Sequence, residues 1–322
     1  MSAEGFDLKG DNSISRPPSR GEILADRAFR GIAYASGGLV VAMLAYILWE
    51  IGGQAAPAIA RDGLGFLTRA VWNPQEHDFG ILAEIWGTLY SSILALLIAG
   101  FFGVAVAIFL TQDFLDARLA RVFRTVIEML AAIPSVVFGL WGIYVVIPAI
   151  RPVANWLHEF LGFIPLFSTP MAGPGMAPAV IVLAIMVLPT VAAISQDAFQ
   201  LIPYKVKEAA YGMGTTRWEA IQKVMLPTAS SGIAASLVLG FGRALGETMA
   251  LAMLIGNSGQ ISLSLFSPAN TLASLLASQF PEAGALEVEQ LMYAALALLG
   301  IALVVNIIGT LIMAMSSKQT VS

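Results

Sequence analysis

The sequence predicts an all-α integral membrane protein with six transmembrane helices, and three observations support this fold class. Hydrophobic residues make up 57% of the 322 residues and charged residues only 12%, whereas a soluble domain has about 25% charged residues. The mean hydropathy of +0.79 indicates more apolar surface than one globular core can bury, so a bilayer is the expected solvent. Six apolar runs are also long enough to cross that bilayer.

The six predicted spans follow from the length of helix, about 20 residues, that crosses roughly 30 Å of hydrocarbon. Apolar runs suited to this task lie near residues 31–50, 85–110, 127–150, 177–198, 229–256 and 291–315. The first run could be mistaken for a signal peptide, because "AIA" at 58–60 resembles a cleavage site. The run is longer than the about 7–15 residues of a signal-peptide core, so we expect an uncleaved anchor.

Lysine and arginine are distributed unevenly between the two sets of connections, which predicts the orientation of the chain. One set holds only Arg61, Arg69 and Arg151. The other set, which includes both termini, holds Lys9, Arg16, Arg20, Arg27, Arg30, Arg118, Arg121, Arg124, Lys205, Lys207, Arg217, Lys223 and Lys318. Because cationic connections stay in the cytoplasm, we expect both termini to be cytoplasmic.

Composition along the chain predicts four segments. Residues 1–27 are rich in Ser, Pro, Gly and Asp, which is typical of a flexible tail, here cytoplasmic. Residues 28–52 are predicted to form the N-terminal transmembrane helix and residues 53–80 an external loop. Residues 81–316 are predicted to form the main transmembrane domain, which includes a cytoplasmic loop at 203–227.

Several classes of function are excluded or disfavoured by composition. The chain has no cysteine, which excludes disulfides, thiol catalysis and cysteine-based metal sites. The two histidines, His77 and His158, lie far apart in the sequence, and no metal site is predicted around either. The net charge is −4 and no polybasic tract is present, so nucleic acid is not an expected partner. No catalytic residues are predicted.

The loop between the fourth and fifth spans, "PYKVKEAAYGMGTTRWEAIQKVMLP" at 203–227, predicts a helix, a sharp turn and a second helix. Residues 205–213 suit a first helix, and Gly214 offers the left-handed residue that ends it. Thr216 followed three positions later by Glu219 is a capping box, which predicts the start of the second helix. Pro227 lies at the junction with the fifth span and indicates either a break or a proline in the first turn of that span.

Two interpretations of this hairpin are open. It could be a surface connection between two spans, or it could be a docking element for a soluble partner. The small side chains of Ala209 and Ala210 favour docking because they let another surface approach closely, and helix-in-groove recognition is a common docking mode.

Four segments of the sequence carry a resemblance to a known family. The "EAA" at 208–210, Gly214 and the "LP" at 226–227 resemble the signature loop of ABC-importer permeases. The segments that resemble phosphate importers are "EAAYGMGTTRWEAIQKVMLP" (208–227), "LAAIPSVVFGLWG" (130–142), "GRALGETMA" (242–250) and "SPANTLASLLASQF" (267–280). Over most of residues 80–315 the chain is similar to C-type permease subunits of phosphate-specific transporters. This resemblance implies a type I ABC-importer permease fold in a bacterial-type cytoplasmic (inner) membrane.

The resemblance also implies partners and coupling residues. The expected partners are an A-type second permease in a heterodimer, a dimer of ATP-binding subunits, an external phosphate-binding protein, inorganic phosphate and membrane lipid. The residues expected to couple to the ATPase are Glu208, Ala209, Ala210, Gly214, Thr216 and Glu219. No lysine of this chain fits the phosphate-loop pattern G-x-x-x-x-G-K-[ST]. We therefore expect no cofactor in this chain, with ATP and Mg²⁺ held by the partner ATPase, and no enzymatic activity of its own.

The fifth predicted span contains two charges, Arg243 and Glu247, although an ion at mid-bilayer costs at least about 2.5–3.5 kcal/mol. At positions i and i+4 of one helix the two would share a face and neutralise each other. Gly240, Gly242 and Gly246 would keep this helix thin and allow close approach. One interpretation is a structural ion pair, although a buried pair adds little stability over apolar residues.

The other interpretation is a site on the translocation path. Arginine presents a planar fork of donors that matches phosphate oxygens, and we expect Glu247 to weaken Arg243 so that the anion is released. In the phosphate-importer family the matching Arg and Glu are implicated in transport. Three alternative functions stay open: an ABC permease for sulfate, molybdate or an organic solute, an ion-coupled carrier with Glu247 as proton relay, and a sensor or assembly subunit without transport.

Two further local features are predicted. Pro134, Pro148 and Pro189 lie within predicted spans and are expected to kink them. The segment at 267–280 is expected to hold a short external helix capped by Asn270 or Thr271.

Overall fold

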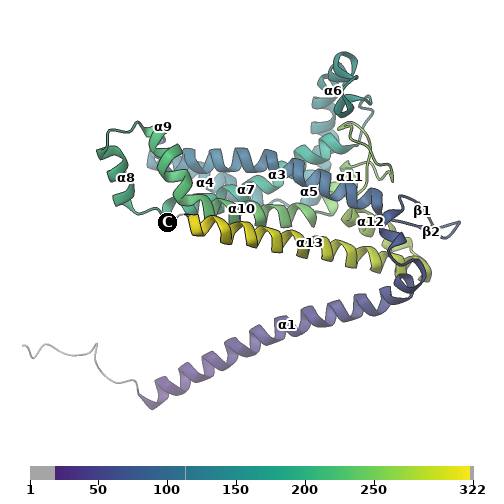
Figure 1. Ribbon diagram of the computed structural model, residues 1–322, viewed down its shortest axis with the longest axis horizontal. Helices are drawn as coiled ribbons and strands as arrows, with labels where there is room; N and C mark the ends of the chain where they lie inside the picture. The colour runs from purple at the N-terminus through teal and green to yellow at the C-terminus, as the bar shows by residue number, and fades with distance from the viewer. Residues whose placement is uncertain (1–18, 113, 320–322) are drawn as a thin grey trace, which may run out of the picture. The chain divides into compact units, whose positions relative to one another are not determined.

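The computed structural model describes residues 19–112 and 114–319 (Figure 1). Of the predicted flexible tail, residues 1–18 lie outside the described residues. Internal contacts divide the chain into two compact units, Met1–Gly53 and Gln54–Ser322. The regular secondary structure of the described part is helical except for two short strands, β1 (Trp72–Asn73) and β2 (Asp78–Phe79), which pair antiparallel. The all-α prediction is therefore confirmed apart from this small ribbon.

Helix α1 (Arg20–Asp62) supplies the described part of the first unit and the first turns of the second. It begins earlier and ends later than the predicted span at 28–52. A reciprocal cap explains the early start, because the Ser19 N–H donates to Glu22 Oε2 at 2.6 Å and the Glu22 N–H donates to Ser19 Oγ at 3.3 Å. Residues 20–27, predicted to be part of the flexible tail, are thus helical.

The remaining elements of the second unit follow in chain order. They are α2 (Gly65–Thr68), α3 (Leu82–Thr111), α4 (Ala117–Ala132), α5 (Ser135–Trp141), the π-turn η2 (Gly142–Val146), α6 (Ile147–Leu161), η3 (Pro165–Phe167), α7 (Met176–Gln200), α8 (Tyr204–Gly212), α9 (Arg217–Ala220), the π-turn η4 (Ile221–Met225), α10 (Leu226–Leu245), α11 (Met249–Leu254), α12 (Leu272–Gln279), η5 (Phe280–Glu282) and α13 (Ala285–Gln319).

Six helical stretches among the described residues are long and apolar enough to cross a membrane, in agreement with the predicted number. They are Arg20–Asp62, Leu82–Thr111, Ser135–Leu161, Met176–Gln200, Arg217–Leu245 and Ala285–Leu311. The third starts later than predicted, because Pro134 lies between α4 and α5 and residues 127–132 belong to α4. The fifth ends at Leu245, earlier than predicted. Pro148 follows η2 at the start of α6, whereas Pro189 stays inside α7.

Helix α7 forms the centre of the second unit, where α3 and α10 pack against it (Figure 1). It is the most buried of the six spans. Two glycines make this packing close: a Cβ added to Gly103 of α3 or to Gly240 of α10 would lie 2.9 Å from a methyl group of Val191 on α7. Small residues at helix contacts are the usual route to close packing in membranes, so the predicted role of Gly240 is confirmed.

The end of the second unit that carries the β-ribbon is held by polar contacts. Arg69 pairs with Asp62 and with Asp78 of β2, both at 2.9 Å, and Arg61 pairs with Glu289 at the start of α13 at 2.5 Å. These are half-exposed ion pairs, each worth little alone. They link three separate chain segments at one end of the helix bundle, within the region predicted to be an external loop.

Helix α12 is anchored on α3 through one glycine and one threonine. The Thr271 side chain accepts from the Ser274 N–H, as predicted for the cap, and the next free amide, that of Leu272, donates to Thr88 Oγ1 at 2.9 Å. A Cβ on Gly87 would overlap the backbone oxygen of Asn270. The short helix therefore needs a glycine opposite its N-terminus.

We expect Gly87→Ala to destabilise the second unit by about 1–3 kcal/mol, because the added methyl must displace backbone atoms. The measurement is the midpoint of thermal unfolding of the purified chain in detergent. Gly300→Ala on α13 is the matched control, since a Cβ there meets nothing within 4 Å. An equal effect of both substitutions would contradict the anchoring of α12 on α3.

Candidate functional site

The hairpin predicted at 203–227 is present, with α8 as its first helix and α9 as the start of its second (Figure 1). Gly214 has φ +83, the left-handed conformation expected of it. The capping box is complete: the Thr216 side chain accepts from the Glu219 N–H, and the Glu219 side chain accepts from the Thr216 N–H at 3.0 Å. The turn between the two helices therefore forms at the residues predicted from the sequence.

The second helix of the hairpin does not stop before the fifth span. Pro227 has no N–H to donate, and the five residues of η4 before it form a π-turn, in which the Leu226 N–H bonds to the Ile221 carbonyl. Helical structure therefore runs from Arg217 to Leu245 without interruption. Pro227 therefore stands in the first turn of α10, which is one of the two predicted alternatives, and the junction has a change of helical pitch instead of a break.

One of the two hairpin alanines does not face outward. Ala210 is 6% exposed and packs with Ala220, Ile221 and Met225 inside the hairpin. Ala209 is exposed, as are Glu208 and Gly214. The expectation that both alanines form a contact surface is therefore wrong for Ala210, whose small side chain lets the two hairpin helices pack together.

Large apolar side chains are exposed on the same hairpin. The exposed fractions are 72% for Tyr204, 86% for Met213 and 60% for Trp218. Such side chains near a rigid turn are typical of a surface that another protein covers. This surface favours docking over the alternative of a simple connection.

The charged segment of the fifth predicted span contains a helix end, which changes the relation between Arg243 and Glu247. Helix α10 ends at Leu245, and Gly246 caps it. The Glu247 N–H bonds weakly to the Ala244 carbonyl at 3.4 Å, and a new helix, α11, starts after Thr248. Glu247 therefore lies outside both helices, so the two charges are not on one helix face.

No ion pair joins Arg243 to Glu247 among the residues that the structure describes, and the predicted mutual neutralisation is wrong in this conformation. Arg243 instead donates from Nη1 to Thr190 Oγ1 on α7 at 3.2 Å. The Arg243 side chain is exposed on the surface of the chain, and Glu247 is partly buried. Thr190 was not singled out from the sequence, although a polar residue next to Pro189 in an apolar span was a visible signal.

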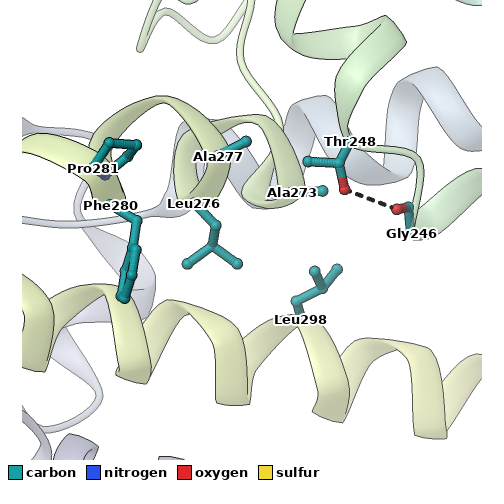
Figure 2. Close-up of a pocket in the computed structure, with 8 residues that line it drawn as sticks. All are labelled: Gly246, Thr248, Ala273, Leu276, Ala277, Phe280, Pro281 and Leu298. Atoms are coloured by element: carbon teal, nitrogen blue, oxygen red, sulfur yellow. Dashed lines mark hydrogen bonds between the residues drawn. The ribbon is translucent and has the colours of Figure 1, made fainter. Parts of the chain in front are cut away.

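A hollow of about 370 Å³ borders the break between α10 and α11. Figure 2 shows its lining: Gly246 and Thr248 at the break, α12 residues on one side, and Leu298 of α13 on the other. The Thr248 hydroxyl donates to the Gly246 carbonyl at 3.1 Å, which satisfies one carbonyl freed at the helix end. The hollow is mainly apolar, so we assign no anion to it.

The segment after α11 is fixed by backbone bonds to the start of α7. The Gly175 N–H donates to the Leu254 carbonyl at 2.8 Å, and the Met176 N–H donates to the Ser267 carbonyl at 3.0 Å. Asn257 adopts φ +48, and its Oδ1 accepts from Ser274 Oγ of α12 at 3.0 Å. The helix break therefore leads into a constrained segment.

Among the residues that the structure describes, no cluster of three His, Asp or Glu side chains could hold a metal ion.

We expect Glu247→Gln to leave the thermal stability of the chain nearly unchanged. Breaking a buried ion pair would cost about 3–5 kcal/mol, but Glu247 forms no ion pair with any residue that the structure describes. Thermal unfolding of the purified variant measures this difference, and Gly87→Ala serves as the destabilised reference. A large loss of stability would restore the structural ion-pair interpretation.

The comparisons with known proteins agree with this geometry. Residues 103–321 match the family described as "Binding-protein-dependent transport system inner membrane component". The chain is 38% identical over 265 residues to the phosphate transport system permease protein PstC of Mesorhizobium japonicum, covering 81% of each chain. It is 41% identical over 281 residues to PstC of Haemophilus influenzae, covering 85% of this chain and 88% of that one.

Solved structures of transporters share the fold at low sequence identity. A bacterial alginate ABC transporter in complex with its alginate-bound periplasmic protein gives a TM-score of 0.59 at 14% identity, covering 88% of this chain and 94% of that one. The inward-facing MetNI methionine ABC transporter gives 0.54 at 18% identity, covering 73% and 95%. The chain belongs to the family of binding-protein-dependent transport system inner membrane components and has the type I ABC-importer permease fold.

Proposed function

We infer that this chain is the permease subunit of an ATP-driven importer that moves inorganic phosphate across the cytoplasmic membrane. The observation that carries this inference is its likeness to PstC phosphate permeases, at 38–41% identity over more than three quarters of both chains. Likeness of that extent favours phosphate over sulfate, molybdate or an organic solute. The hairpin disfavours an ion-coupled carrier, because such a carrier has no need to dock a soluble motor.

The ATPase is a separate chain in this proposal. The sequence offers no phosphate-loop lysine, whereas the hairpin offers exposed Tyr204, Met213 and Trp218 for docking. A dimer of ATP-binding subunits, with its ATP and Mg²⁺, would bind here. An external binding protein would deliver phosphate to the opposite end, and a second, A-type permease would complete the pathway.

Arg243 is the residue that we assign to the translocation path. Its guanidinium donates from one nitrogen to Thr190, and its other donors have no partner among the described residues and lie on the exposed face of the chain. A planar fork with free donors matches two phosphate oxygens. Thr190, a neutral acceptor, orients Arg243 without cancelling its charge.

Glu247 does not act in this proposal as a fixed ion-pair partner of Arg243 on one helix face. It lies beyond the end of α10 on backbone that is not helical. Movement at Gly246 could bring this carboxylate towards Arg243 or away from it, since glycine accepts many backbone conformations. We propose that its approach displaces phosphate from Arg243 during release, which satisfies the requirement that binding be weak enough to reverse.

Arg243→Gln should lower phosphate uptake by about tenfold or more, because charge-assisted hydrogen bonds contribute about 1.5–3 kcal/mol. Uptake of radiolabelled phosphate into proteoliposomes that hold the full complex measures the effect. Thr190→Val is the matched control: it removes the orienting bond but keeps the charge, so a smaller loss is expected. Full uptake by Arg243→Gln would contradict the assignment and favour a sensor or assembly subunit. Uptake by this chain alone, without ATP, would favour a carrier.

Docking at the hairpin can be tested by crosslinking, because the natural chain contains no cysteine. We expect Met213→Cys to crosslink to the copurified ATP-binding subunit with a short bifunctional thiol–amine reagent. Phe163→Cys is the control, since Phe163 is similarly exposed at 81% but follows α6, at the other end of the second unit. Equal crosslinking of both positions, or none at Met213→Cys, would contradict ATPase docking at this hairpin.

A further inference from the structure

A second cavity, this one polar, lies at the end of the helix bundle that carries the hairpin, away from Arg243. Its volume is about 260 Å³, and it opens between the ends of α3 and α7 and the first half of α4. Its polar lining consists of Arg121, Arg124, Gln196 and Gln200, and apolar lining comes from Leu110 and Leu115. The proposed transport function assigns no role to these residues.

Gln196 is the buried polar group in this cavity. It is 2% exposed, on the last turns of α7. Within residues 19–112 and 114–319 its side-chain amide forms no hydrogen bond, and the amide atoms reach the open cavity. Buried amides are nearly always paired in native proteins, so an unpaired amide that lines a cavity indicates a ligand atom or a water molecule in that cavity.

The charges around the cavity favour an anion. Arg121 donates only from Nε, to the Ala117 carbonyl at 3.3 Å, and its two terminal nitrogens have no partner within the described chain. Arg124 is paired with Glu128 at 3.1 Å and with Asp197 at 3.4 Å. Glu128 and Asp197 are thus paired with Arg124, whereas Arg121 forms no ion pair with any residue that the structure describes.

Helix α4 adds an apolar surface next to this cationic cavity. Large apolar side chains of α4 are exposed at a spacing of three or four residues: Leu119, Val122, Phe123, Val126 and Met129. Such a stripe beside arginines is typical of an amphipathic helix at the membrane surface. A ligand with a charged head and apolar tails fits this combination better than a small ion does.

We propose that this cavity binds a phosphate group, supplied by the headgroup of an anionic phospholipid. Arg121 provides a two-pronged donor to the phosphate oxygens, and the Gln196 amide donates to a further oxygen of the headgroup. The cavity is smaller than the about 300–1,000 Å³ of a site that encloses a whole ligand, so the acyl chains lie outside it, along the stripe of α4. Basic pockets between membrane helices are known to bind acidic headgroups in this way.

The occupant would join α4 to the end of α7. Helix α4 packs against α7, and none of its residues is buried. A bound headgroup would bridge Arg121 of α4 and Gln196 of α7. Lipid would then hold α4 in place, which burial in the core does not do. Free inorganic phosphate shares the recognised group and is the second possible source.

Native mass spectrometry of the full-length chain, released from nanodiscs of phosphatidylcholine doped with phosphatidylglycerol, tests the proposal. We expect retained phosphatidylglycerol on the natural chain and about fivefold weaker retention in Arg121→Gln, the effect of one juxtamembrane arginine. Arg118→Gln is the matched control, because Arg118 lies on the same helix but does not line the cavity. Gln196→Leu keeps all charges, and should also weaken retention.

The outcomes distinguish a lipid headgroup from free inorganic phosphate, and both from the absence of a site. Loss in Arg121→Gln and Gln196→Leu, with retention in Arg118→Gln, supports a lipid headgroup. If inorganic phosphate added in detergent raises the unfolding temperature of the natural chain but not of Arg121→Gln, and no lipid is retained, the site is a phosphate site filled by the free ion. Equal losses in Arg118→Gln and Arg121→Gln, or neither ligand bound, would overturn the proposal. A normal unfolding profile of each variant confirms that it is folded.

Discussion

Backbone hydrogen bonding inside hydrocarbon is the constraint on which the rest of this structure depends. No water is present there to satisfy a free N–H or C=O group, so a chain that leaves the helix must find partners within the protein. The interruptions of this chain obey that rule. At the break after α10, the Thr248 hydroxyl donates to the Gly246 carbonyl. In the region between α11 and α12, the amides of Gly175 and Met176 donate to the carbonyls of Leu254 and Ser267. Irregular structure is tolerated where the core supplies those partners.

The number of spans and the hairpin could be predicted because both depend on local signals. Apolar length determines whether a helix crosses a bilayer, and Gly214 and Thr216 determine where helices end and begin. The start of α1 was predictable in the same way, since Ser19 and Glu22 form a cap, but the Ser-, Pro-, Gly- and Asp-rich composition of residues 1–27 as a whole outweighed that signal. The late start of the third span was also visible in the sequence, at Pro134.

Tertiary relations could not be read in the same way. The spacing of Arg243 and Glu247 suggested one helix face, yet spacing is informative only while the helix continues, and it ends at Leu245. The partner of Arg243 is Thr190, 53 positions earlier in the chain. The cavity beside α4 combines residues from three helices, and no local pattern brings Arg121 to Gln196. Pairs of this kind depend on how the helices pack, for example on the glycines that let α3 and α10 approach α7 closely.

The unbroken helix from Arg217 to Leu245 has a mechanical consequence. At about 1.5 Å of rise per residue, Arg217 and Arg243 are separated by roughly 39 Å along one stiff rod. A tilt of about 5° at the hairpin would therefore carry the far end of the rod roughly 3 Å sideways, comparable to the length of a hydrogen bond. A lever of this length converts a small displacement at the motor into the making or breaking of a contact at the guanidinium.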